Sequence, residues 1–190
     1  MRALATAASA AGLLVAGCGV SVGGKPPPPP VPVKQLPRGD MTLTTPAFPD
    51  HGVFPAKYTC DGLDISPPLD VFGVPAATKE LALLLIDTSA NEFVHWIVFG
   101  IPNDVIIIRE DELPPDAIQA TNSYGFSRYN GPCPPPGPPH HYDFELYALS
   151  VKLSQSLPPG VSRSRAMTAI LATAIARTDL AATYQRAPGA

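Results

Sequence analysis

The chain has 190 residues, of which 45% are hydrophobic and 15% are charged, and its formal net charge is −3. This composition provides enough apolar side chains for one domain with a hydrophobic core. It gives no basic surface of the kind that binds nucleic acid, so we expect no nucleic-acid partner. The 25 prolines fall largely in residues 26–37 and in later loop segments, and therefore do not indicate a wholly disordered chain.

Residues 1–18 have the pattern of a bacterial lipoprotein signal peptide. Arg2 is followed by a short run of small apolar residues that is too short to span a membrane. The run ends in Val15-Ala16-Gly17-Cys18, which resembles a lipobox and predicts a diacylglycerol on Cys18. Two acyl chains would anchor the protein stably to a membrane. The alternative is an ordinary secretory signal in which Cys18 has no role, and both readings place the domain outside the cytoplasm.

Residues 19–40 are rich in proline and glycine and predict an extended, semi-rigid tether. The folded domain is expected to cover residues 41–184, and residues 185–190 are expected to fray. Within the domain, residues 41–45 alternate in polarity and predict a half-buried strand. A second short strand is expected within residues 53–59.

Two continuous apolar runs, residues 80–87 and 93–99, predict central strands that are buried on both faces. Pro102 should end the second run because proline donates no ladder hydrogen bond. Residues 105–108 are expected to form an edge strand. Residues 109–124 are acidic and contain prolines, and are expected to form a solvent-exposed loop. Residues 143–151 predict a further well-packed strand.

The C-terminal part changes from strand to helical periodicity. Apolar residues recur at helical spacing from Met167 to Thr178, with Ser162 or Ser164 available as N-cap and Arg177 near the C-terminal end. The pattern therefore predicts a mainly β domain that ends in a C-terminal α-helix.

A proline-rich loop, residues 125–142, ends in the polar sequence His140-His141-Tyr142. Six prolines and three glycines exclude a helix or a central strand there. Because the polar residues stand at the end of a rigid loop, we expect them at the mouth of a pocket. An ordinary surface loop is the alternative.

A hairpin of residues 80–87 and 93–99 would pair residue 87 with 93 and residue 85 with 95, which places Asp87 and His95 on one face. If His140 begins the next strand, His140 and Tyr142 share a face as well. Next to Asp87 the histidines should gain protons more readily and become donors to an anion. Backbone N–H groups at Gly131 and near Cys133 could complete an anion nest. A purely structural Asp–His pair is the alternative.

Other chemistries have less support in the sequence. The Gly-x-Ser-x-Gly motif of serine hydrolases is absent, as are phosphate-loop and dinucleotide fingerprints. Asp87, His95 and His140 could in principle bind zinc, but no ligand spacing supports a metal and none is expected. With Cys18 set aside, Cys60 and Cys133 form either a disulfide or two free thiols.

Three motifs, in order, resemble the phosphatidylethanolamine-binding protein family in its bacterial Raf-kinase-inhibitor-like branch. They are Cys60-Asp-Gly-Leu-Asp-Ile-Ser-Pro-Pro-Leu69, Asp87 with Phe93-Val-His-Trp96, and Gly131-Pro-Cys-Pro-Pro-Pro-Gly-Pro-Pro-His-His-Tyr142. The sequence departs from the family at Asp87-Thr-Ser-Ala90, where Asp-Pro-Asp-Ala-Pro is usual. It also has Val71-Phe72 where a tryptophan is common. The resemblance therefore leaves the ligand unspecified.

The resemblance implies a β-sandwich of Greek-key character and a small pocket for an anion, such as phosphate or a phosphorylated headgroup. By motif position the pocket would be lined by Asp87, His95, His140, Tyr142, Gly131 and Pro132, with Asp61 and Pro68 nearby. No cofactor and no catalysis are implied. A protein-interaction module, for example a protease inhibitor or signalling modulator, is the alternative function, and a hydrolase using the same His/Asp set is a third.

Overall fold

The computed structural model describes residues 40–187, so the predicted signal peptide, Cys18 and nearly all of the tether lie outside the described residues. The described chain is mainly β, with two sheets and one α-helix, as predicted. The small sheet has the order β1-β3-β6 and consists of β1 (Thr42–Thr44), β3 (Leu69–Phe72) and β6 (Ile107–Ile108). β6 lies at its edge, as expected for residues 105–108.

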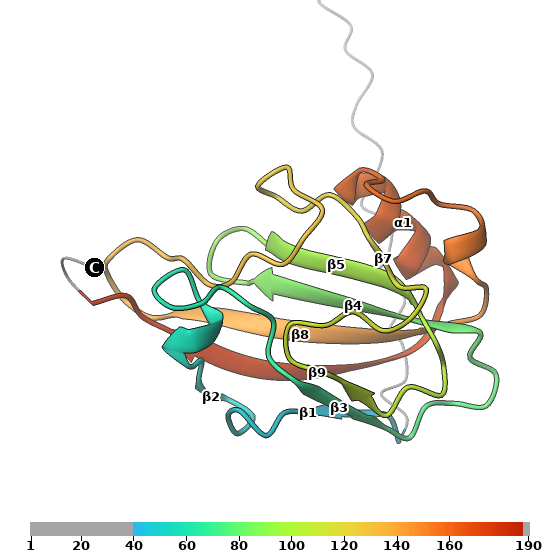
Figure 1. Cartoon of the computed structure of the whole chain (residues 1–190), viewed down its shortest axis with the longest axis horizontal. Coiled ribbons are helices and arrows are strands. Elements are labelled where there is room, and N and C mark those ends of the chain that lie inside the picture. The colour runs from blue at the N-terminus through green and yellow to red at the C-terminus, as the bar shows by residue number, and fades with distance from the viewer. Residues whose placement is uncertain (1–39, 188–190) are drawn as a thin grey trace, which may run out of the picture. The chain divides into compact units, whose positions relative to one another are not determined.

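The large sheet has the order β2-β9-β8-β4-β5-β7. Its strands are β2 (Gly52–Val53), β4 (Glu80–Asp87), β5 (Phe93–Ile101), β7 (Ile118–Gln119), β8 (His140–Leu149) and β9 (Ala174–Tyr184). β2 runs parallel to β9, and the other neighbours are antiparallel. Figure 1 shows β8 and β9 as two long neighbouring strands with β4 and β5 beside them.

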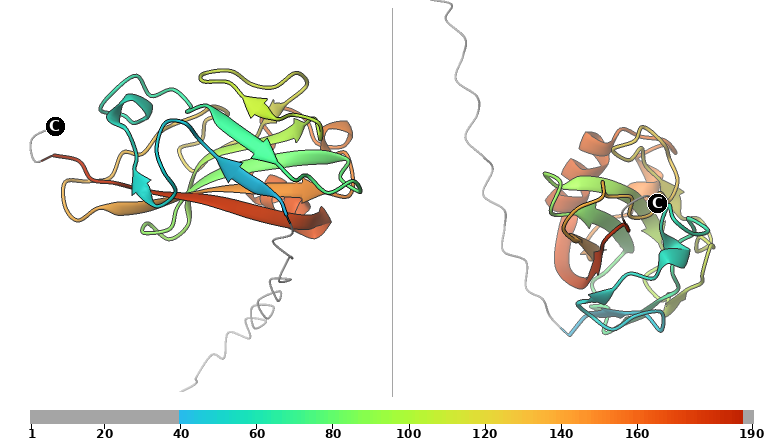
Figure 2. Two further views of the ribbon diagram at one scale, coloured as in Figure 1. Left: turned by 90° about the horizontal axis from the view of Figure 1, so that it is seen from below. Right: turned by 90° about the vertical axis from the view of Figure 1, so that its left-hand side faces the viewer.

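The large sheet is covered on both faces, which explains why all eight residues of β4 are buried. Leu81, Leu83 and Leu85 point toward the small sheet and share a core with Leu69 and Ile108. The alternate residues pack on the other face in a second core that includes Ile170 of the helix α1 (Arg163–Thr173). In Figure 2 the helix and the small sheet accordingly lie on opposite sides of the large sheet. A strand buried on both faces needs a continuous apolar sequence.

The C-terminal prediction is only half right, because the helix stops at Thr173 and residues 174–184 form β9. Residues 174–184 do alternate: Ala176, Leu180 and Ala182 are buried in the core. Pairing along the whole of β8 therefore overrides the helix preference of the alanines. Ser162 does stand at the N-cap, but its side chain makes no capping hydrogen bond.

Three further expectations need correction. Residues 53–59 are not a strand, since the chain leaves β2 at Val53 and turns through the 3₁₀ helix η1 (Ala56–Tyr58) after Pro55. Residues 109–124 are not wholly solvated, because they include β7, which pairs with β5. The chain is not free directly after Tyr184, since Gln185 donates to the Gly137 carbonyl at 2.7 Å; residues 188–190 of the expected frayed tail lie outside the described residues. A second 3₁₀ helix, η2, covers Leu153–Gln155.

Cys60 and Cys133 form a disulfide with a sequence separation of 73 residues. It joins the loop that precedes β3 to the proline-rich loop that precedes β8. The bridge is supported by a backbone hydrogen bond from the Cys60 N–H to the Pro132 carbonyl at 3.2 Å. The proline-rich loop is therefore fixed covalently as well as by its own stiffness.

We expect the double variant Cys60→Ser/Cys133→Ser to lose about 4 kcal/mol of unfolding free energy, because the bridge restricts a long loop in the unfolded chain. Denaturant unfolding followed by circular dichroism measures this loss. Wild-type protein in reductant should unfold at the midpoint of the double variant, and reductant should not shift that variant further. Coinciding midpoints for oxidised wild type and the double variant would contradict the expectation.

Candidate functional site

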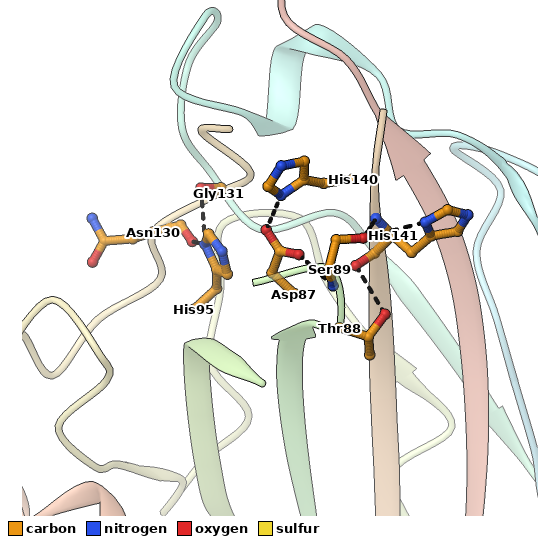
Figure 3. Close-up of polar contacts among 8 residues, drawn as sticks. All are labelled: Asp87, Thr88, Ser89, His95, Asn130, Gly131, His140 and His141. Carbon is orange, nitrogen blue, oxygen red and sulfur yellow. Dashed lines mark hydrogen bonds and ion pairs between the residues drawn. The ribbon is translucent and has the colours of Figure 1, made fainter. Parts of the chain in front are cut away.

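The candidate site lies where β4 ends and β8 begins. Asp87 and Tyr142 are direct cross-strand partners, so their side chains point to the same face. The Asp87 carboxylate is almost fully buried and accepts a hydrogen bond from His140 Nδ1 at 2.7 Å. Its other oxygen accepts the Ser89 N–H at 2.9 Å. Figure 3 shows Asp87 with His140 on one side and His95 on the other.

His95 reaches this face through a β-bulge rather than by the predicted register. Asp87 does pair with Phe93, but Leu85 pairs with Trp96 and not with His95. His95 is the extra residue between the pairs at Val94 and Trp96. Both His95 and Trp96 consequently turn toward the core between the sheets, and the His95 ring lies 5.4 Å from the Tyr142 ring. The prediction that Asp87 and His95 share a face is correct, although the register behind it is wrong.

The His95 imidazole is fixed in one orientation by the proline-rich loop. Its Nδ1 lies 2.9 Å from the Asn130 carbonyl and 3.1 Å from the Gly131 carbonyl, so Nδ1 carries the proton and donates it to them. Nε2 is then left without a proton in the neutral ring. Burial lowers the pKa of His95 and outweighs the nearby Asp87 carboxylate, which acts in the opposite direction. In the ligand-free protein His95 is therefore less readily protonated than predicted.

Tyr142 places a buried hydroxyl in the same site. This oxygen makes no hydrogen bond of normal geometry within residues 40–187. Burial raises the pKa of Tyr142, and the nearby Asp87 carboxylate raises it further. The phenol is thus a neutral donor that lies near the Asp87 carboxylate but makes no hydrogen bond of normal geometry with it. Such a buried hydroxyl is costly unless a ligand or water completes its hydrogen bonding.

The proline-rich loop forms one wall of the site, but it supplies no nest at Gly131. The Gly131 N–H is already bound to Asp64 Oδ1 at 2.6 Å, which corrects the expectation that it is free for an anion. Gly131 and Pro132 are both buried. A Cβ on residue 131 would collide with the Tyr58 carbonyl oxygen, so the wall requires glycine here. Asp64, which sequence reasoning missed, is therefore the residue that holds the wall in place.

Asn122 organises the opposite rim, and sequence reasoning missed it too. Its Nδ2 donates to the His95 carbonyl at 3.0 Å, to the Arg128 carbonyl at 3.1 Å and to Asn130 Oδ1 at 2.8 Å. Its Oδ1 accepts the N–H groups of residues 124 and 126. The segment so held carries Tyr124, whose ring packs edge-on against His95 at 5.6 Å. The sequence gives no signal for this role, because Asn122 is an isolated asparagine within residues 109–124, for which a solvated loop is predicted.

Asp61, Pro68 and His141 form hydrogen bonds with residues outside the group of Asp87, His95, His140 and Tyr142. Asp61 accepts the Tyr184 hydroxyl at 2.7 Å and pairs with Arg186, and these contacts lower the pKa of Asp61. Asp61 therefore fixes the end of β9, where Tyr184 is the cross-strand partner of His140. The Pro68 carbonyl accepts the Thr45 hydroxyl at 2.6 Å, and no hydrogen bond joins Pro68 to Asp87 or His95 within the described residues. His141 is exposed and contacts Ser89.

Two negative findings apply to residues 40–187. No group of three or more His, Cys, Asp or Glu side chains there is arranged to hold a metal ion. No helix in that range is long and apolar enough to cross a membrane.

Comparison with known proteins agrees with this geometry. Residues 44–185 match the family model described as phosphatidylethanolamine-binding protein. The chain belongs to this family. The UPF0098 protein of Methanothermobacter thermautotrophicus is 41% identical over 153 residues, which are 77% of this chain and 99% of that protein. The Mycobacterium tuberculosis protein named "Putative lipoprotein LppC" is 37% identical over 148 residues, covering 76% of this chain and 72% of the relative.

A solved structure of the same family has the same fold. Escherichia coli YbcL, described as a member of the mammalian PEBP family, superposes with a TM-score of 0.72 at 27% sequence identity. The match covers 78% of this chain and all of YbcL. The predicted family and its β-sandwich are thus confirmed. In this chain the sandwich carries the bulge in β5 and the proline-rich loop that forms the wall of the site.

We expect Asn122→Asp to destabilise the domain by about 2–4 kcal/mol, because an acceptor would replace the donor that faces three oxygens and leave at least two of them unsatisfied. Denaturant unfolding measures the change. Asn103→Asp is the matched control, since Asn103 is exposed and its amide makes one hydrogen bond, to the Thr78 carbonyl. Equal losses in the two variants would show that Asn122 has no special role.

The lowered pKa of His95 predicts how stability depends on pH. The unfolded chain takes up a proton on this histidine near its ordinary value of 6.5, whereas the folded chain does so at lower pH. The unfolded state therefore binds more protons in that interval, and stability falls as the pH drops below about 6.5. His95→Gln should flatten this part of the stability profile measured in sulfate-free buffer. The matched control is His51→Gln at an exposed histidine, and an equal flattening in that variant would contradict the assignment to His95.

Proposed function

We propose that this domain is a non-catalytic binding module that takes a small oxyanion, such as phosphate or a phosphorylated headgroup, between His95, His140 and Tyr142. The observation that carries the proposal is the buried Tyr142 hydroxyl, which lies beside the Asp87 carboxylate and two imidazoles and makes no hydrogen bond of normal geometry within residues 40–187. Each imidazole has Nδ1 committed to the protein, His95 to backbone carbonyls and His140 to Asp87. The Nε2 atoms and the phenol are then left to bind a ligand.

The roles follow from these contacts. Asp87 orients His140 by accepting its Nδ1 proton, while Tyr142 donates a neutral hydrogen bond. His95 must take up a proton at Nε2 before it can donate to an oxyanion, and a bound anion offsets the burial that opposes this. The hydroxyls of Ser89 and Thr88 contact His141 rather than His95 or His140. This arrangement favours binding over nucleophilic catalysis.

A membrane-bound location is the second part of the proposal. The lipobox at Cys18 and the similarity to a protein named as a lipoprotein both support it. Diacylation of Cys18 would hold the binding domain outside the cytoplasm on a proline-rich tether.

We expect sulfate to bind more tightly at pH 5.5 than at pH 7.5, because the bound form needs a protonated His95. Isothermal titration calorimetry measures this difference. Sulfate is the sharper probe because it keeps its charge over this range, whereas hydrogen phosphate can donate its own proton to a neutral Nε2. Affinity that is independent of pH would contradict the proposed role of His95.

We expect Tyr142→Phe to weaken sulfate binding about tenfold at either pH, corresponding to one lost hydrogen bond to a charged group. The thermal midpoint should stay the same or rise, because the substitution removes a buried hydroxyl without a partner. A matched phenylalanine substitution at Tyr147, whose hydroxyl bonds Glu145 on the same strand, should leave sulfate affinity unchanged. Loss of stability without loss of affinity in Tyr142→Phe would sink the proposal.

A further inference from the structure

A second concave site lies beside the candidate pocket and is separate from it. It is a groove of about 570 Å³, and none of Asp87, His95 and His140 lines it. Its volume falls within the range of ligand-binding clefts. The lining comes from loops 63–66 and 111–113, from β5 and β7, and from the segment 128–129.

The floor of this groove is preformed. The Trp96 indole N–H donates to Gln119 Oε1 at 2.7 Å, and the Tyr129 ring packs edge-on against the indole at 5.3 Å. Tyr129 is held in turn by its hydroxyl, which donates to the Tyr58 carbonyl at 2.8 Å. Trp96 is only 2% exposed, so a ligand would mainly meet the Tyr129 ring, which is held over the buried indole and would not have to be ordered on binding.

Two exposed leucines stand at the groove on different loops. Leu63 has 67% of its surface exposed and Leu113 has 39%. Exposed apolar side chains that gather around a cleft, rather than lying scattered over the surface, mark an interaction site. The groove therefore offers apolar contacts in addition to its aromatic floor.

The charge of the lining is predominantly negative. Asp64, Asp111 and Glu112 contribute carboxylates, and the contact of Glu112 with Arg109 is long, at 3.7 Å, and exposed. The single cation of the lining, Arg128, places its guanidinium over the Phe126 ring. Within residues 40–187 no ion pair joins Arg128 to these carboxylates. The groove thus has unbalanced negative charge at an apolar surface.

We propose that this groove binds an extended, basic peptide segment of a partner protein. Arginine or lysine side chains of the segment would lie against Asp64, Asp111 and Glu112, and its apolar side chains would pack on Leu63, Leu113 and the aromatic floor. Alternating basic and apolar side chains match a lining in which carboxylates and leucines come from the same two loops. This interaction is independent of anion binding at His95 and His140.

The experiment uses Trp96, the one tryptophan of the chain, as a reporter in the floor of the groove. The full-length protein is titrated with a peptide of alternating leucine and arginine while tryptophan fluorescence is followed. We expect saturable binding that weakens as salt is added, and no binding of the same peptide with glutamate in place of arginine. Absence of saturable binding by the basic peptide, or equal binding of both peptides, would overturn the proposal.

Two matched variants separate a site from general charge attraction. Asp111→Asn/Glu112→Gln removes two charges from the groove, and asparagine tolerates the left-handed backbone at residue 111. We expect at least tenfold weaker peptide binding and unchanged sulfate binding, which keeps this test distinct from that of the anion site. Asp40→Asn/Asp104→Asn removes the same charge from exposed positions outside the groove and should bind the peptide as wild type does. Equal affinities of the two double variants would also overturn the proposal.

Discussion

The candidate site depends on the buried carboxylate of Asp87. A charge with only 5% of its side chain exposed must be compensated, and Asp87 achieves this with the His140 Nδ1 proton and the Ser89 N–H. Both partners are available because β4 ends at Asp87 and β8 begins at His140, so the ends of two central strands meet at one point. The same meeting buries Tyr142, the cross-strand partner of Asp87. The polar site is thus a consequence of where the central strand β4 ends and its neighbour β8 begins.

The second histidine is positioned by a different device. The bulge in β5 turns His95 into the space between the sheets, and the proline-rich loop accepts its Nδ1 proton with backbone carbonyls. That loop has few donors of its own and is fixed by the disulfide, by the Asp64 carboxylate and by the close approach of Gly131 to Tyr58. A rigid wall that presents carbonyls selects one tautomer of His95 and leaves Nε2 facing the site. The disulfide and the Asp64 hydrogen bond fix the proline-rich loop, and that loop in turn sets the tautomer of His95 on β5.

Much of this could be predicted from the sequence, and the failures have identifiable causes. Asp87, His95, His140 and Tyr142 stood out because polar residues are conspicuous at the ends of apolar runs. The pairing of Leu85 with Trp96 could not be predicted, since nothing in Phe93-Val-His-Trp96 marks a bulge. Asp64 and Asn122 act through contacts with residues that are distant in sequence or in irregular loops, where periodicity gives no signal. β9 was misread because alanines satisfy a helical and an alternating pattern equally well, and only pairing with β8 decides between them.

The electrostatic balance at His95 explains how one site can be stable when empty and still suit an anion. Burial lowers the pKa of this histidine, and the carboxylates of Asp87 and Asp64 act against burial without overcoming it. In the empty site the ring is therefore neutral and adds no further buried charge. In the proposed complex, an oxyanion beside Nε2 would contribute negative charge at much shorter range than either carboxylate and would reverse this balance. Proton uptake and anion binding would then be one coupled event. Asp64 belongs to both the wall of this site and the lining of the acidic groove. Because its Oδ1 is committed to Gly131, the place of Asp64 in the wall is fixed by the protein itself and does not depend on what the groove binds.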